Sequence, residues 1–380
     1  MLRAVKFGGS SVAGPEQFKK VKNIIEAEPS RKLVVVSAAG KRSSDDHKLT
    51  DLLYLCHAHL TYGVSCDDIL ETIGARFLEI KRELGLEYDV EAEFEAFCKG
   101  LNKSVTVDEI VSRGEYFTAR LMAEYLGFGF VDAKDCVFFG IDGQIDREKT
   151  DAAIKQAVKE QGRLVMPGFY GRLPTGRIKV MSRGGSDISG ALLAAAAEAD
   201  IYENWTDFSG ILMADPRIVE SPRSIPVITY AELRELAFMG ASVLHEESIL
   251  PVKEKGIPLA ILNTNRPEDP GTVICDRVQE EEAIHERFIT GVAGRKNFTI
   301  ITVIKRDMNT SSPLRHALEI LDRYHAHVEH ITLGLDSFAF VTSTAALGDA
   351  LFDVLSDIRK TCRPDDVRIE DNIADRKSVV

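Results

Sequence analysis

A short apolar run passes directly into two glycines in Ala4-Val5-Lys6-Phe7-Gly8-Gly9-Ser10-Ser11-Val12. The run predicts a strand over 3–7, and the glycines let the following backbone approach an anionic ligand closely. Hydroxyl groups and a helix start would add donors for phosphate oxygens, and Lys6 would neutralise charge. A tight turn with a surface lysine explains the same residues, because no Walker pattern is present. The loop therefore needs support from the rest of the chain.

Similar apolar runs alternate with helical patterns through the first two-thirds of the chain. The predicted elements are strands at 32–37, 163–167, 199–202 and 258–262, and helices at 16–26 and 189–198. This alternation predicts an α/β domain whose mainly parallel sheet is covered on both faces, with ligands beyond the carboxyl ends of the strands. Residues 49–101 are rich in helical patterns and are expected to cap one side of the sheet.

The pattern changes after the charged segment 277–287, which is typical of a surface linker. We place a domain boundary there and predict domains at 1–283 and 284–380. The second domain has a βαββαβ pattern typical of a ferredoxin-like unit. Its predicted elements are strands at 298–304, 328–333, 337–342 and 367–370, and helices at 313–325 and 346–360. Residues 376–380 begin another strand pattern.

Composition limits the class of protein. A chain of 380 residues is long enough for two domains, and a net charge of −12 argues against nucleic acid or an anionic membrane as the main partner. The six cysteines are scattered without a CxxC pair, so we expect reduced thiols and neither a disulfide framework nor a zinc site. With no secretory leader or membrane-spanning run recognised, we expect a cytoplasmic enzyme acting on a small molecule.

Two further loops carry chemical groups. In Ser182-Arg183-Gly184-Gly185-Ser186-Asp187, ahead of an alanine-rich helix, the arginine offers a fork for a carboxylate and Asp187 can orient catalytic groups. Helix capping explains Ser186 or Asp187 equally well but leaves the Arg-Gly-Gly unexplained. In the loop 205–217, Asp207 can accept from a ribose or base and Arg217 can reach phosphate, although an ordinary surface loop has the same composition.

The ordered set KFGGSSV (6–12), SAAGK (37–41), SRGE (112–115), SRGGSD (182–187), WTDFSGILMADPR (205–217) and GASVLH (240–245) resembles the aspartokinases of the amino acid kinase superfamily. The resemblance implies a three-layer αβα amino acid kinase fold. It also implies ATP-dependent phosphorylation of the L-aspartate side-chain carboxylate to 4-phospho-L-aspartate, the first step towards lysine, threonine and methionine. Mg²⁺ would be held mainly by the ATP phosphates, with no protein ligand assigned.

The resemblance also implies roles for individual residues. Lys6 and Asp187 would be catalytic. The ATP-binding residues would be Lys6, Phe7, Gly8, Gly9, Ser10, Thr206, Asp207, Leu212 and Arg217. Aspartate would be held by Thr50, Glu115, Arg183 and Ser186, with the acid binding its ammonium and the arginine its α-carboxylate. For Glu115, the favourable position of an acid in the first turn of a helix is an alternative explanation.

The C-terminal unit resembles an ACT domain, which binds amino-acid effectors. The resemblance implies a lysine or threonine site at Met308, Ser311, Thr332, Asp336 and Ser337, although simple packing explains Met308 equally well. ACT units commonly pair, so a homodimer is expected. The chain ends where family members begin a second ACT unit, so we expect either a naturally short form or a truncated sequence.

The chain departs from the family pattern at Ser242, where most members carry a lysine near the ATP phosphates. Losing one charged hydrogen bond would weaken nucleotide binding by about 1.5–3 kcal/mol, and Lys6, Arg217 and Mg²⁺ would compensate. Two alternatives remain, a related kinase acting on glutamate and a non-catalytic amino-acid sensor. The retained Lys6, Arg183 and Asp187 favour the active aspartate kinase.

Overall fold

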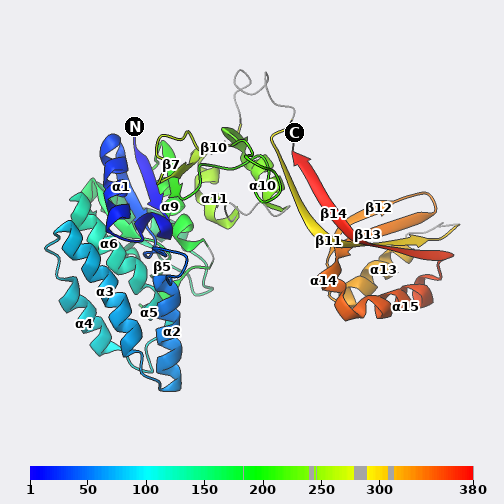
Figure 1. Ribbon diagram of the computed structural model, residues 1–380, viewed down its shortest axis with the longest axis horizontal. Coiled ribbons are helices and arrows are strands. Elements are labelled where there is room, and N and C mark those ends of the chain that lie inside the picture. Colours follow the sequence, from blue (N-terminus) through cyan, green and yellow to red (C-terminus); the bar gives the residue numbers. More distant parts are fainter. Residues whose placement is uncertain (183, 239–243, 245, 278–288, 307–311, 380) are drawn as a thin grey trace. The chain divides into compact units, whose positions relative to one another are not determined.

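The computed structural model describes residues 1–182, 184–238, 244, 246–277, 289–306 and 312–379 (Figure 1). The chain groups into two compact units. The first comprises Met1–Arg234 with Ser242–Thr290, and the second comprises Glu235–Ala241 with Gly291–Val380. The domain boundary predicted between 283 and 284 lies outside the described residues.

The first unit is built on an eight-stranded sheet with the order β3-β4-β2-β1-β7-β9-β10-β8. Neighbours from β3 to β9 are parallel, β10 is antiparallel to β9, and β8 is parallel to β10. The strands are β1 (Arg3–Phe7), β2 (Arg31–Val36), β3 (Gly129–Phe130), β4 (Leu164–Pro167), β7 (Ile201–Thr206), β8 (Val227–Thr229), β9 (Leu259–Asn263) and β10 (Thr272–Cys275). The predicted α/β class with a mainly parallel sheet is confirmed.

Helices cover the two faces of this sheet (Figure 1). The helices of this part of the chain are α1 (Pro15–Ala27), α2 (Leu49–Tyr62), α3 (Asp67–Leu84), α4 (Val90–Gly100), α5 (Val107–Val111), α6 (Arg113–Leu126), α7 (Ala133–Cys136), α8 (Arg147–Gln161), α9 (Gly185–Ala196), α10 (Tyr230–Phe238) and α11 (Glu246–Glu254). A short 3-10 helix, η1 (Gly9–Val12), follows β1, and the hairpin β5 (Tyr170–Arg172) and β6 (Ile178–Val180) precedes α9. Residues 49–101 form α2 to α4, as their helical patterns predict.

Successive side chains of β1 point to opposite faces of the sheet, so Val5 and Phe7 lie on one face and Lys6 on the other. Val5 and Phe7 are fully buried in a hydrophobic cluster with α1 residues such as Phe18 and α6 residues such as Phe117. Because successive side chains of a strand point to opposite faces, Lys6 lies on the other face, where α9 packs. A lysine in a central strand is therefore placed beside the N-terminal turn of α9.

The strand predicted at 199–202 was wrong in its extent, because β7 runs from Ile201 to Thr206 and includes two residues assigned to the following loop. Glu203 and Asn204 are buried within it, and they interrupt the apolar pattern that marks a central strand. Glu203 is partnered by Arg3 at 2.5 Å and by Arg31 at 2.8 Å. The arginine partners come from β1 and β2, which lie far away in the sequence. The sequence around β7 therefore does not show that its buried carboxylate is paired.

The second unit contains a four-stranded antiparallel sheet with the order β12-β13-β11-β14. Its elements are β11 (Gly291–Ile304), α13 (Ser312–Arg323), β12 (Val328–Leu333), β13 (Ser337–Ser343), α14 (Thr344–Leu347), η2 (Gly348–Ala350), α15 (Leu351–Cys362) and β14 (Asp366–Val379). Residues of α13 and α15 form a core with Ile301, Phe338 and Phe340. This confirms the predicted ferredoxin-like βαββαβ unit.

The last strand of the second unit is longer than predicted. The strand at 367–370 and the separate pattern at 376–380 belong to one strand, β14, which pairs with β11 from Gly291↔Val379 to Ile304↔Asp366. The pairing shifts register near Phe298, where Asn297 and, on β14, Asn372 have positive φ angles of 68° and 60°. Asparagine tolerates this conformation, and such irregularities divide a long strand into two apparent patterns.

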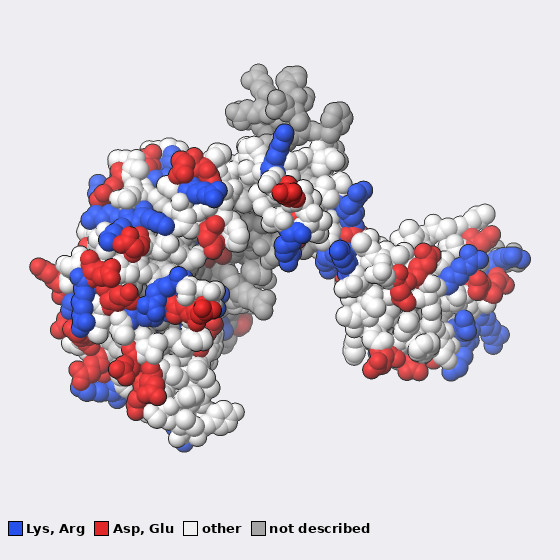
Figure 2. Space-filling view, in the orientation of Figure 1, with Lys and Arg blue, Asp and Glu red and all other residues white. Residues whose placement is uncertain are grey.

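Charged side chains of both signs are interspersed over the face shown in Figure 2. Among the described residues, no helix has both the length and the apolar character needed to cross a bilayer. All six cysteines are free thiols.

Candidate active site

The loops that follow the central parallel strands leave the sheet at one edge. Phe7, at the end of β1, is level with Val36 of β2 and with Trp205 of β7, and Val36 is level with Pro167 of β4. The chain places β2 on one side of β1 and β7 on the other, so the connections reverse direction between β1 and β7. Ligands of open α/β sheets bind at such a reversal.

Lys6 and Asp187 form an ion pair at this reversal. Nζ of Lys6 lies 2.6 Å from Oδ1 of Asp187, and the lysine is only 7% exposed. Asn204, level with Lys6 on β7, donates from Nδ2 to the same carboxylate oxygen at 3.0 Å and accepts from Lys6 Nζ at 3.4 Å. The structure thus brings together the two predicted catalytic residues and adds Asn204, which the sequence did not reveal.

Two glycine loops touch backbone to backbone beside this pair. The Gly40 N–H donates to the Gly9 carbonyl at 2.8 Å, and the Gly8 N–H donates to the Trp205 carbonyl at 3.0 Å. A Cβ atom on Gly40 would lie 2.6 Å from the Gly9 carbonyl carbon, and one on Gly9 would lie 2.9 Å from the Ala38 oxygen. Both positions require glycine for this reason. Phe7 is buried against Trp205, so its side chain serves the core.

The loop after β9 is tied to η1 by a buried hydroxyl pair and to the end of β7 by a backbone hydrogen bond. Thr264 Oγ1 lies 2.7 Å from Ser11 Oγ, and the Thr264 N–H donates to the Thr206 carbonyl at 2.8 Å. Thr206 in turn donates to the exposed Asp207 at 3.1 Å. These residues place the predicted ribose or base contacts next to the predicted phosphate loop.

The other two predicted nucleotide contacts lie further along the loop. Leu212 is half-buried and bridges to Ser224. Arg217 is 86% exposed and pairs with Asp215 at 2.6 Å. To contact a phosphate, the Arg217 guanidinium has to leave this carboxylate.

Glu115 is a buried carboxyl group without a full set of partners. It is 4% exposed in the first turn of α6, and its Oε2 has no hydrogen-bond partner among the described residues. Burial raises its pKa to about 8, against the opposing effect of the backbone N–H groups of Ala38 and of Glu115 itself. A cation entering this position would satisfy the free oxygen and favour the ionised form.

Two other predicted substrate residues, Thr50 and Ser186, lie near the loops after β2 and β4. Thr50 is the second residue of α2, whose first N–H, on Leu49, donates to the Ala39 carbonyl at 3.4 Å. Ser186 lies in the first turn of α9, so close to the loop after β4 that a Cβ atom on Gly168 would lie 2.7 Å from the serine Cβ. Arg183 and Ser242 lie outside the described residues.

Two other predicted features concern metal and effector binding. The described residues contain no group of three or more His, Cys, Asp or Glu side chains arranged to hold a metal ion. In the second unit, Thr332 lies in β12, Ser337 begins β13 and Asp336 lies in the turn between them. Met308 and Ser311 lie outside the described residues.

Known proteins with similar sequences and structures identify the family. The model of the amino acid kinase family matches residues 1–263. Aspartokinase 3 of Bacillus subtilis is 32% identical over 98% of this chain and 85% of its own length. The crystal structure of aspartate kinase from Clostridium acetobutylicum superposes with a TM-score of 0.89 at 43% identity, over 98% of this chain and 85% of that one. Escherichia coli aspartokinase III, solved with lysine and aspartate, has a TM-score of 0.73 at 26% identity, over 98% and 86% of the chains.

A glycine-rich loop and a lysine–aspartate pair at the strand reversal of such a sheet are features expected of a small-molecule kinase. The chain belongs to the amino acid kinase family and, within it, to the aspartokinases. The predicted family, enzyme class and aspartate kinase function are thereby confirmed.

Proposed function

We propose that this aspartokinase transfers the γ-phosphoryl group of ATP to the side-chain carboxylate of L-aspartate, with Mg²⁺ accompanying the nucleotide. The observation that carries the proposal is the Lys6–Asp187 pair, which lies at the same strand edge as the buried, partly unsatisfied Glu115. Escherichia coli aspartokinase III has been solved with aspartate and ADP, at 27% identity and a TM-score of 0.70. This supports the same pair of substrates here.

Lys6 is proposed to stabilise the group in transfer. A phosphoryl group spreads negative charge over its oxygens as it moves, and a fixed cation beside it lowers the barrier. Asp187 and Asn204 hold the Lys6 ammonium, so little reorganisation is needed when the phosphate arrives. Mg²⁺ bound to the nucleotide would supply further positive charge to the phosphate oxygens. The Mg²⁺ would be held mainly by the ATP phosphates, and no protein ligand is assigned to it.

Glu115 is proposed to bind the ammonium of aspartate. Its unsatisfied oxygen needs a donor, and an ammonium supplies both hydrogen bonds and charge. Arg183 is proposed to grip the α-carboxylate, and Thr50 and Ser186 to complete the pocket around the side chain. The substrate carboxylate would then be fixed for in-line attack, and catalysis would rest on positioning and charge neutralisation.

The nucleotide is proposed to lie along the loops after β1 and β7. Its phosphates would be held by the Lys6–Ser10 backbone, and its sugar and base by Thr206, Asp207 and Leu212. Arg217 would join them after leaving Asp215.

Feedback control by lysine or threonine at the second unit is part of the proposal. It is supported by the lysine complex of the Escherichia coli relative. The effector residues, the homodimer, the cytoplasmic location and the domain boundary stay predictions.

The experiment is a hydroxylamine trap, which converts an acyl phosphate into a coloured hydroxamate. The protein is given ATP and Mg²⁺ with aspartate, glutamate or acetylglutamate, with and without lysine and threonine. We expect product from aspartate only, and Arg183→Ala should raise the KM for aspartate strongly. Turnover of glutamate but not aspartate, or aspartate binding without any hydroxamate, contradicts the proposal.

A further inference from the structure

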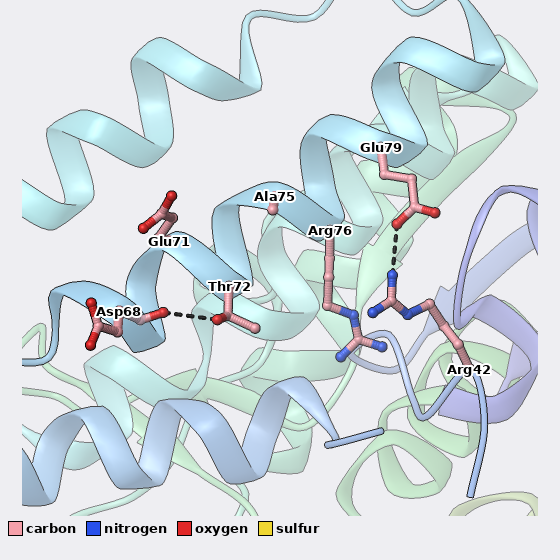
Figure 3. A pocket seen from close by; sticks show the side chains of 7 residues that line it. All are labelled: Arg42, Asp68, Glu71, Thr72, Ala75, Arg76 and Glu79. Atoms are coloured by element: carbon pink, nitrogen blue, oxygen red, sulfur yellow. Dashed lines mark hydrogen bonds and ion pairs between the residues drawn. The ribbon is translucent and has the colours of Figure 1, made fainter. Parts of the chain in front are cut away.

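A groove of about 530 Å³ lies along the outer side of α3, away from the residues assigned so far. Figure 3 shows its seven lining residues, six of them on α3 and Arg42 on the loop after β2. Arg76 points from α3 towards that loop. Unlike the other arginine of the groove, it is only 3% exposed.

The Arg76 guanidinium is occupied by the loop between β2 and α2. Its NH2 group donates to the Gly40 carbonyl at 2.5 Å and to Asp46 Oδ2 at 3.0 Å, and its NH1 group donates to the His47 carbonyl at 2.7 Å. Two of the three acceptors are backbone carbonyls, so Arg76 fixes the path of the chain and not only a side chain. One arginine thus holds both ends of residues 40–47.

The first of these carbonyls belongs to the glycine that contacts the phosphate loop. The Gly40 N–H donates to Gly9 at 2.8 Å, and the two backbones are too close for a Cβ atom on either residue. Arg76 and Gly9 therefore hold the two peptide groups that flank Gly40, Gly9 through the Gly40 N–H and Arg76 through the Gly40 carbonyl. A shift of Gly40 towards the groove would remove the contact that supports the Gly9 carbonyl.

We propose that Arg76 is a positioning residue for phosphoryl transfer, acting through Gly40 to hold the loop that receives the ATP phosphates. The proposal rests on the function proposed above for that loop. Arg76 does not itself reach the reacting atoms. Its planar fork serves two carbonyls at once, which the single ammonium of a lysine cannot do in the same geometry.

A second arginine, Arg42 on the loop after β2, provides a control substitution. Arg42 also binds Asp46, at 3.0 Å, but its second partner is Glu79 at 2.7 Å on the surface of α3 and not a backbone carbonyl. Arg42→Lys and Arg76→Lys therefore change the same type of residue and the same acidic partner. Only the second substitution removes the support of Gly40.

The experiment compares wild type, Arg42→Lys, Arg76→Lys, Gly40→Ala and the Arg76→Lys/Gly40→Ala double variant. For each, the KM for ATP, the KM for aspartate, kcat and the calorimetric Kd for ADP are measured. We expect Arg76→Lys to raise the KM for ATP and the Kd for ADP about tenfold, the effect of roughly one lost charged hydrogen bond, with less change for aspartate. Arg42→Lys should stay within about twofold of wild type.

The double variant separates positioning from a general loss of stability. If Arg76 acts through Gly40, Gly40→Ala alone weakens nucleotide binding and Arg76→Lys adds little to it. Unchanged ADP binding in folded Arg76→Lys, equal losses in both arginine variants, or full additivity with Gly40→Ala overturns the proposal. If Arg76→Lys does not fold, unchanged ADP binding by Gly40→Ala overturns it instead. Failure of the wild type to form hydroxamate refutes the proposed function separately, since ADP binding still reports on Arg76.

Discussion

Aspartate binding is expected to release a proton from Glu115. The carboxyl of the free enzyme has its pKa raised to about 8 by burial, so it is mostly protonated at neutral pH. An ammonium beside Oε2 stabilises the carboxylate, and the proton then leaves as the substrate enters. From a pKa of about 8, close to 0.9 of a proton should be released per aspartate bound at pH 7.

The burial of Glu115 also determines how the free energy of unfolding changes with pH. Because the folded pKa lies above the ordinary value of 4.5, the protonated group's contribution to stability is complete below pH 4.5 and is lost as the pH rises through about 8. Within that window the loss is about 1.4 kcal/mol per pH unit. Between about pH 5.5 and about pH 7.5, wild type should therefore lose roughly 2.7 kcal/mol that Glu115→Gln does not lose.

Two measurements test this reasoning. Titration calorimetry of aspartate in buffers with different ionisation enthalpies gives the protons released, with Glu115→Gln as the control that should release none and bind more weakly. Urea unfolding of both proteins at the two pH values gives the difference in free energy of unfolding. Aspartate binding without proton release at pH 7, together with parallel pH dependence of the two proteins, would refute a protonated Glu115.

Three more predictions concern other contacts of the catalytic unit. Lys6→Ala and Asp187→Ala should each lower kcat about a hundredfold or more while changing the KM for aspartate little, measured by hydroxamate formation. If Asp187→Ala keeps kcat within about threefold, its assigned role is wrong. Thr264→Val should raise the KM for ATP a few-fold by breaking the hydroxyl pair with Ser11, and Thr264→Ser should restore it; equal values for the two variants would contradict this. Glu203→Gln should lower the free energy of unfolding by about 3–5 kcal/mol, because two arginines lose a buried partner, and a urea midpoint equal to that of wild type would exclude this.

The regular parts of the fold could be predicted because their signals are local. The runs at β2, β4 and β9 are mostly apolar on both faces, as strands covered by helices on both faces are, and β1 departs from this pattern at Arg3 and Lys6. The second unit shows the same agreement, since buried and partly exposed residues alternate along β13, which pairs with β12 across a tight turn. Short strands such as β3, with two residues, carry too little pattern to be recognised.

The loops of the candidate site could be predicted from the sequence, but the contribution of Asn204 from strand β7 could not. The glycine and hydroxyl residues after β1 and β2 and at the starts of α6 and α9 stand out because such backbone freedom is rare within regular elements. Asn204 does not stand out, since an asparagine in a polar stretch has the composition of a loop. Only the pairing of β7 with β1 places it level with Lys6.

Buried polar residues in central strands explain both why Asn204 was not predicted and where the site lies. Lys6, Glu203 and Asn204 occupy central strands, where each would be costly without a partner. Glu203 is satisfied by arginines from β1 and β2 and stabilises the sheet, whereas Lys6 and Asn204 share one carboxylate from α9 on the opposite face. A polyphosphate approaching this edge would meet a lysine that is already oriented and only partly neutralised. Of the residues that break the apolar strand pattern, Lys6 and Asn204 are therefore the two through which the fold could act on phosphate.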